Sequence, residues 1–120
     1  MKTILTNLFI SLCLILPADA FRVDELKTPQ SFIVDPPLGS YFISNINGNP
    51  VSRDNNGFIM KLDGSGKLLL SIHGGSHQIT LHAPDGLALK GNHLYVTDID
   101  SVRWFDKNNG KPLGHIDFTG

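Results

Sequence analysis

Short apolar runs separated by turn residues dominate the chain from residue 29 to residue 117. The runs are rich in β-branched and aromatic residues, and Gly, Asn and Pro stand between them. No stretch of this part repeats its apolar residues about every 3.6 positions, as an amphipathic helix would. The pattern therefore predicts an all-β fold of short strands joined by turns. We expect strands at 31–35, 40–45, 57–62, 67–72, 86–90, 93–98, 102–106 and 112–117.

The first four expected strands match the last four in order and in chemistry. The matched segments are 29–31 with 84–86, 41–46 with 94–99, and 62–67 with 105–111. Extra residues within 47–57 account for the greater length of the first half. This self-similarity indicates one structural unit that is used twice.

A repeat of four antiparallel strands over about 40–50 residues is the unit of a β-propeller, whose blades stack around a central channel. We expect two blades, at about 29–73 and about 84–117, within a domain that spans 21–120. A complete propeller has about 4 to 8 blades, so we expect a truncated or partial propeller, or one that self-associates through exposed blade faces. The alternative is a closed eight-stranded sandwich, which would give no reason for the two halves to match.

The first twenty residues carry a different signal. Lys2 provides a positive start, an apolar run covers 4–16, and small residues follow at Ala18 and Ala20. This is the pattern of a signal peptide with an A-x-A cleavage site, and the run is shorter than the roughly 20 apolar residues of a membrane-spanning helix. We expect residues 1–20 to be removed, leaving a periplasmic or secreted protein with no membrane segment.

Composition and charge limit the kinds of partner that the chain is expected to bind. The chain has 10 Lys plus Arg and 11 Asp plus Glu, a formal net charge of -1, and no cluster of basic residues. A phosphate backbone needs a basic patch, so we expect no nucleic acid partner. The one cysteine, Cys13, lies in the expected signal peptide, so burial alone must stabilise the mature chain. Export without disulfides is compatible with the periplasm.

Two strings of the sequence resemble a known family: PQSFIVDPPLGSYFISNINGNPVSRDNNGFIMKLDGSGK and APDGLALKGNHLYVTDIDSVRWFDKNNGKPLG. They look like two consecutive blades of the gluconolactonase/regucalcin family, whose sequence style overlaps with that of NHL-repeat propellers. The resemblance covers nearly all of residues 29–117. It implies a six-bladed propeller, of which this chain would be a part. It also implies metal-dependent hydrolysis of sugar lactones, with a small lactone or sugar-like ligand.

The resemblance further implies a metal site at the residue that follows the opening proline of each repeat. These positions hold Gln30 and Asp85. In the family, Glu, Asn and Asp at such positions of several blades bind one divalent cation, often calcium, that polarises the lactone carbonyl. Asp85 matches this pattern, whereas Gln30 places a neutral amide where a Glu is expected. For both residues the alternative is a turn role at the start of a strand.

Asn45 and Asp98 align with each other at the end of the second strand of each repeat. In the resembled family, polar residues near this point reach the substrate, which makes both residues candidates for substrate binding. Asp and Asn at a strand end also form Asx turns, so the structural alternative stays open.

Two functions of different classes are open. The first is a gluconolactonase-like hydrolase with little activity on its own, whose catalytic residues are not identified. The second is a non-catalytic periplasmic NHL-type propeller that binds a protein or glycan partner, and Gln30 favours it. The sequence contains no Gly-x-Ser-x-Gly motif, and the expected mature chain has no cysteine, so neither usual nucleophile is indicated. A non-functional truncated product is a third hypothesis.

Overall fold

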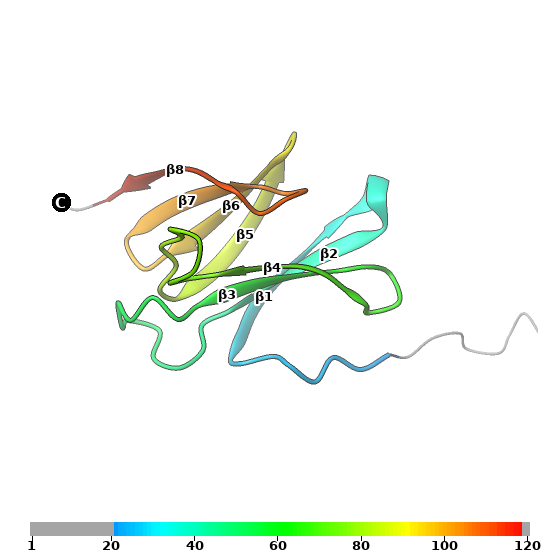
Figure 1. Cartoon of the computed structure of the whole chain (residues 1–120), viewed down its shortest axis with the longest axis horizontal. Coiled ribbons are helices and arrows are strands. Elements are labelled where there is room, and N and C mark those ends of the chain that lie inside the picture. Colours follow the sequence, from blue (N-terminus) through cyan, green and yellow to red (C-terminus); the bar gives the residue numbers. More distant parts are fainter. Residues whose placement is uncertain (1–20, 119–120) are drawn as a thin grey trace, which may run out of the picture.

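The computed structural model describes residues 21–118, so the expected signal peptide lies outside the described residues. The described part is all-β, with eight strands, one short 3-10 turn (Pro36–Leu38) and no α-helix (Figure 1). None of its helical structure is long and apolar enough to cross a membrane. The strands are β1 (Pro29–Asp35), β2 (Ser40–Asn45), β3 (Phe58–Leu62), β4 (Leu68–His73), β5 (Pro84–Lys90), β6 (His93–Asp98), β7 (Ser101–Asp106) and β8 (Pro112–Asp117).

Each half of the sequence forms one four-stranded antiparallel sheet. The first sheet has the order β1-β2-β3-β4 and the second sheet has the order β5-β6-β7-β8. The prediction of two matching four-stranded sheets is confirmed, and a sandwich in which strands of the two halves interleave is wrong. All eight predicted strands are present, with ends that differ by at most two residues. The arrangement is consistent with two consecutive propeller-like blades.

Both first strands begin two residues earlier than predicted, at Pro29 and Pro84. In each sheet the pairing register shifts directly after this proline, between Pro29 and Ser31 and between Pro84 and Leu87. A proline has no backbone N–H and cannot donate to a neighbouring strand. It is tolerated here because β1 and β5 are edge strands, which pair with another strand of the sheet on one side only. The repeat therefore extends to an irregularity at the same place in both sheets.

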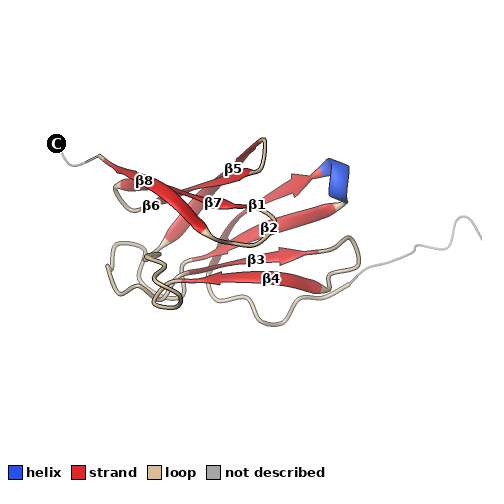
Figure 2. Ribbon diagram, turned by 45° about the horizontal axis from the view of Figure 1, so that its top comes forward, coloured by secondary structure: helices blue, strands red, loops and turns tan. Residues whose placement is uncertain are grey.

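The main hydrophobic core lies between the two sheets. Side chains alternate along a strand, so one face of each sheet supplies the core. The core contains Phe42, Ile59 and Ile72 from the first sheet, Leu94, Val96 and Phe105 from the second sheet, and Ile79 and Leu81 from the connection between them. β1 packs beside β5, which places the two first strands next to each other (Figure 1). Figure 2 shows the sheets as two separate layers.

The other face of the first sheet carries a smaller cluster, made of Phe58, Met60 and Leu62. The segment that precedes β1 packs on this cluster through Val23 and Leu26. This face of the sheet is therefore only partly covered by the chain itself.

The connection from β4 to β5 passes close to the backbone of the first sheet. Gly57 N–H donates to Leu81 O at 3.1 Å, and Gly74 N–H donates to Gly57 O at 2.9 Å. A Cβ atom on Gly57 would lie 2.3 Å from Pro84 Cδ and 2.8 Å from His82 O. The connection can approach this closely only because residue 57 has no side chain.

Candidate functional site

The two predicted metal-binding residues stand at equivalent places in the two sheets. Gln30 is the second residue of β1 and Asp85 is the second residue of β5, and both are exposed. Because β1 packs beside β5, they lie on neighbouring strands. Within residues 21–118, no group of three or more His, Cys, Asp or Glu side chains is close enough to hold a metal ion. The assignment of Gln30 and Asp85 to a metal site stays a prediction.

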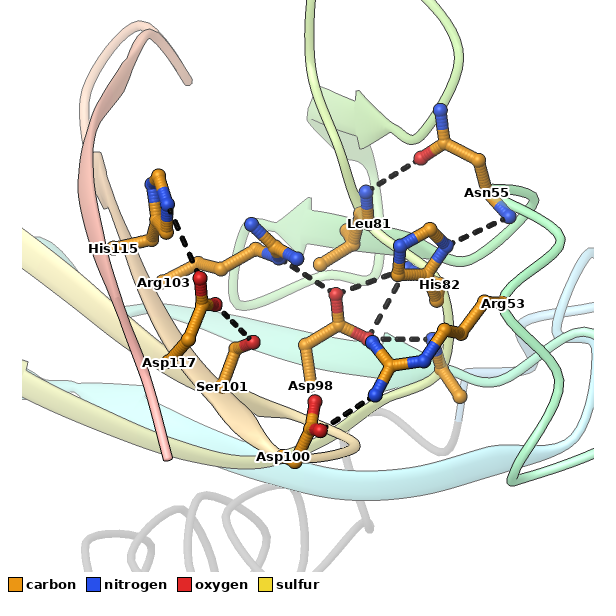
Figure 3. A network of polar contacts seen from close by, with 11 residues as sticks. Arg53, Asn55, Leu81, His82, Asp98, Asp100, Ser101, Arg103, His115 and Asp117 are labelled. Atoms are coloured by element: carbon orange, nitrogen blue, oxygen red, sulfur yellow. Dashed lines mark hydrogen bonds and ion pairs between the residues drawn. The ribbon is translucent and has the colours of Figure 1, made fainter. Parts of the chain in front are cut away.

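Asp98, a predicted substrate-binding residue, is the centre of the polar network in Figure 3. Its side chain is fully buried. The carboxylate accepts the backbone N–H of His82 at 3.1 and 3.0 Å and that of Ala83 at 2.7 Å. Arg103 Nε also donates to it at 2.7 Å, as part of an ion pair. Asp98 thus fixes the segment that leads into β5 to the end of β6.

Asn45 makes an equivalent contact in the first sheet. It is fully buried, its Oδ1 accepts the Lys27 N–H at 2.9 Å, and its Nδ2 donates to Ile43 O at 3.2 Å. Lys27 stands two residues before the proline that opens β1, as His82 does before β5. The aligned pair Asn45 and Asp98 therefore shares one observed structural contact, and its contact with a substrate stays a prediction.

Two hydroxyl groups support the irregular starts of β1 and β5. Ser44 Oγ accepts the Ser31 N–H at 3.1 Å, and Thr97 Oγ1 accepts the Gly86 N–H at 2.8 Å. They satisfy backbone donors where the ladder is interrupted. Ser44 Oγ also donates to Asp85 O at 2.6 Å, a bond that crosses from the first sheet to the second. Sequence reasoning assigned these hydroxyls no role, although the repeat aligns them directly before Asn45 and Asp98.

Charged side chains also connect the two sheets. Lys107 Nζ pairs with Asp35 at 2.8 Å, and both side chains are largely buried. Lys61 Nζ donates to Lys107 O at 3.0 Å and lies 5.4 Å from the centroid of the Phe42 ring. The ring face attracts the ammonium group. The interface between the sheets thus combines an apolar core with a few directed polar contacts.

The structure lowers the pKa of two partly exposed carboxyl groups, those of Asp63 and Asp100. Arg53 Nη2 donates a hydrogen bond to Asp100 Oδ2 at 2.6 Å, and this bond is the largest of the causes that lower the pKa of Asp100. The pKa of Asp63 is lowered first by the hydroxyl of Ser65 and then by the backbone N–H of Lys67. Asp63 accepts these bonds inside the β3–β4 turn, so it acts as a turn residue.

A serine, a histidine and an aspartate lie together at the edge of the same network. Ser101 Oγ donates to Asp117 Oδ1 at 2.7 Å, and His115 Nε2 lies 3.7 Å from Asp117 Oδ2 (Figure 3). An activated serine needs a base within hydrogen-bond reach of its hydroxyl, and that base is oriented by a third group. Here the hydroxyl and the imidazole both face the carboxylate. In a nucleophilic triad the histidine stands between the serine and the aspartate, so these three residues are not arranged as one.

An apolar groove of about 470 Å³ lies on the outward face of the first sheet. It is lined by Phe32, Tyr41 and Ile43 of the sheet and by Phe21 and Val23 of the preceding segment. The Phe21 ring stacks on Tyr41, with the ring centroids 6.1 Å apart. Burial raises the pKa of Tyr41, and the charge of the nearby Asp63 raises it further.

Comparison of the sequence with protein-family models gives no match, and comparison with curated proteins also gives none. The resemblance to the gluconolactonase/regucalcin family therefore stays a prediction. The function must be argued from the arrangement of the described residues.

Proposed function

We propose that the chain is an exported, non-catalytic β-propeller-type module that binds a protein partner through its outward sheet faces. The observation that carries this proposal is the exposure of apolar side chains on both faces. Phe32 is 67% exposed on the first sheet and Ile116 is 52% exposed on the second, and Val34 and Leu69 extend the first set. Apolar side chains gathered on one surface mark protein interaction sites in soluble proteins.

The polar residues support binding rather than hydrolysis. Asn45 and Asp98 are fully buried and hydrogen-bonded to the backbone of their own chain. A substrate that contacted them would have to break those bonds, and the loss of the acceptor of the buried Ala83 N–H alone costs about 1–3 kcal/mol. The groove on the first sheet is mainly apolar, which suits protein side chains better than the hydroxyl-rich surface of a glycan.

A gluconolactonase-like activity is the second candidate, because one observation favours it. Asp85 is exposed at the start of β5, beside the strand that carries Gln30. A bound calcium ion would polarise a lactone carbonyl. Calcium takes about 6–8 oxygen ligands, and its affinity rises with their number and charge. One carboxylate and one amide do not fit that requirement, so we derive no catalytic step from them.

Hydrolysis of a panel of aldonolactones by the purified protein, with calcium and with a chelator, tests the proposal. We expect no calcium-dependent turnover above that of an Asp85→Asn variant. Asp54→Asn is the matched control, because Asp54 is also an exposed carboxylate and lies outside the predicted metal site. Turnover by the wild type and by Asp54→Asn that is lost in Asp85→Asn would overturn the proposal in favour of the hydrolase.

Export forms part of the proposal and has its own test. Mass spectrometry of the protein recovered from the periplasm or medium of expressing cells should find a mature chain that begins at Phe21. A product that retains residues 1–20 would contradict cleavage after Ala20.

A further inference from the structure

We propose that the protein partner is a second copy of this chain, held by a repeat of the interface that joins the two sheets within one chain. The inference rests on the proposed function and names the partner. The donor surface is the outward face of the second sheet, called the open face here, with Tyr95, Thr97, Val102 and Ile116. The acceptor surface is the outward face of the first sheet of the other copy, called the receiving face, with Phe32, Val34, Tyr41 and Ile43.

The open face is the repeat equivalent of a face that is already buried inside the chain. Val102 pairs with Ile116 across β7 and β8, as Ile59 pairs with Ile72 across β3 and β4. Ile59 and Ile72 are each 1% exposed in the main core, whereas Ile116 is 52% exposed. The alternation of side chains along the strands therefore gives both sheets the same kind of apolar face. The second sheet covers this face of the first sheet, whereas the same face of the second sheet is left open.

Tyr95 and Thr97 extend this equivalence to β6. They align with Phe42 and Ser44, which are both fully buried against the second sheet. Tyr95 is half-buried and Thr97 is exposed. A further sheet placed on Tyr95 would bury it as the second sheet buries Phe42.

One directed hydrogen bond gives the proposed contact a register. Ser44 Oγ donates to Asp85 O across the interface inside the chain. Thr97 is the equivalent of Ser44, and its hydroxyl accepts the Gly86 N–H in the same way. Within residues 21–118, no hydrogen bond donated by Thr97 Oγ1 is found. The equivalent of Asp85 is Gln30, so the carbonyl of Gln30 in the second copy is the acceptor that the repeat assigns to Thr97.

The receiving face carries the complementary equivalence. Phe32 and Val34 align with Leu87 and Leu89, which pack against the main core inside the chain. Phe32 and Val34 are instead exposed, and Phe32 lines the apolar groove of the first sheet. The open face and the receiving face therefore correspond, through the repeat, to the two sheet faces that pack together inside the chain.

The segment before β1 is compatible with this docking over most of its length. Lys27 bonds to Asn45 as His82 bonds to Asp98, so the residues next to Lys27 run where the connection into β5 runs. That connection lies beside the packed first sheet, with Leu81 in the main core. Phe21 is different, because it stacks on Tyr41 in the groove. It must move aside when the second copy binds.

The proposed contact joins two different surfaces, so it is heterologous and either closes into a ring or continues as an open chain. A propeller has about 4 to 8 blades, and residues 21–118 of each copy form two sheets, so a closed ring of these sheets holds about two to four copies. The ion pair between Lys107 and Asp35 has no counterpart between copies, since the equivalent positions are Gly64 and Lys90. The contact between copies is therefore weaker than the contact within one chain, and its formation depends on concentration.

Cross-linking of the full chain through introduced cysteines tests the pairing of the two surfaces. Both variants, Thr97→Cys and Gln30→Cys, carry Cys13→Ser so that no native thiol remains. A short thiol cross-linker should join the two proteins when they are mixed, and should join neither protein to itself. Self-coupling of Thr97→Cys alone would show a symmetric contact of open faces and would overturn the proposal. The absence of any coupled product at high concentration would also overturn it.

A pair of variants on β8 separates the open face from general surface apolarity. Ile116→Asp places a charge on the open face, and Leu113→Asp places one on the opposite side of the same strand at a site of similar exposure, 47% against 52%. We expect Ile116→Asp to abolish association and Leu113→Asp to retain it, with both variants keeping the circular dichroism spectrum of the wild type. Equal association of the two variants would overturn the inference. The lactone assay is independent of this result, so failure of self-association leaves the proposed function intact, and calcium-dependent turnover removes the proposed function whatever the oligomeric state.

Discussion

Replacement of Asp98 tests the polar network most severely, because one buried carboxylate organises three donors. In Asp98→Ala the N–H groups of His82 and Ala83 lose their acceptor, and Arg103 loses its ion-pair partner. The Arg103 side chain is largely buried, so water replaces the lost partner poorly. The segment that leads into β5 is then no longer fixed to the end of β6.

The magnitude follows from these contacts. A buried donor without an acceptor costs about 1–3 kcal/mol, and removing one member of a buried ion pair costs about 3–5 kcal/mol. The two costs overlap, so we expect Asp98→Ala to lower the free energy of unfolding by about 3–5 kcal/mol. A domain of this size has a total of about 5–15 kcal/mol, and its melting temperature falls by about 4–8 °C per kcal/mol. The melting temperature should therefore fall by about 12 °C or more.

The repeat supplies a matched control within the same chain. Asn45 fixes only one backbone donor, that of the exposed Lys27, so Asn45→Ala should cost only about 1–2 kcal/mol. The counterpart of Arg103 in the first sheet is Met60, because Arg103 pairs with Val96 as Met60 pairs with Ile43.

Urea unfolding followed by tryptophan fluorescence measures all these variants. The double variant Asp98→Asn with Arg103→Met replaces the ion pair by the residue types that stand at the equivalent positions of the first sheet, Asn45 and Met60. It should be less destabilised than the sum of its two single variants by about 0.5–3 kcal/mol. A cost below about 1 kcal/mol for Asp98→Ala, or an Asn45→Ala variant that is the less stable of the two, would refute the reasoning.

Three further predictions concern other parts of the chain. Gly57→Ala should lower the free energy of unfolding by at least about 1–3 kcal/mol through overpacking, because its Cβ would meet Pro84 Cδ at 2.3 Å; Gly64→Ala, whose nearest contact is 3.3 Å, should cost less in the same urea experiment. Arg53→Gln should raise the pKa of Asp100 towards its ordinary value of 3.8 in an NMR titration, and an unchanged value would exclude the contact with Arg53 as the cause. Since the folded state lowers this pKa, the stabilisation from the pair is complete above the unfolded-state value near 3.8 and is lost as the pH falls through the lower folded value. Ser65→Ala should likewise raise the pKa of Asp63, because the Ser65 hydroxyl is the largest cause that lowers it, and an unaltered Asp63 titration would contradict that role.

The strands were predictable because their signals are local. Turn residues and β-branched runs bound each strand, and the repeat doubled the evidence for each of them. The starts at Pro29 and Pro84 were missed because those ends depend on contacts across the sheet. The hydroxyls of Ser44 and Thr97 sit 13 and 11 residues from the donors that they satisfy. No local pattern encodes such a pairing.

For the candidate site, the repeat predicted which residues are equivalent in the two sheets but not which contacts they make. The repeat correctly placed Asn45 and Asp98 at equivalent positions, but their burial depends on partners 18 and 16 residues away in the sequence. Arg103 is close in sequence to Asp98, yet its buried ion pair requires the β6–β7 turn to bring the two side chains together. The cluster of Ser101, His115 and Asp117 escaped prediction because β7 and β8 must pair before its members meet.

Sedimentation velocity of the wild-type protein over a wide range of concentrations tests the central proposal, that the outward sheet faces bind copies of the same chain. We predict a mass that rises with concentration from one chain to a closed assembly of about two to four chains and then stays constant, as expected for a propeller of about 4 to 8 blades. A mass of one chain at every concentration would contradict the claim.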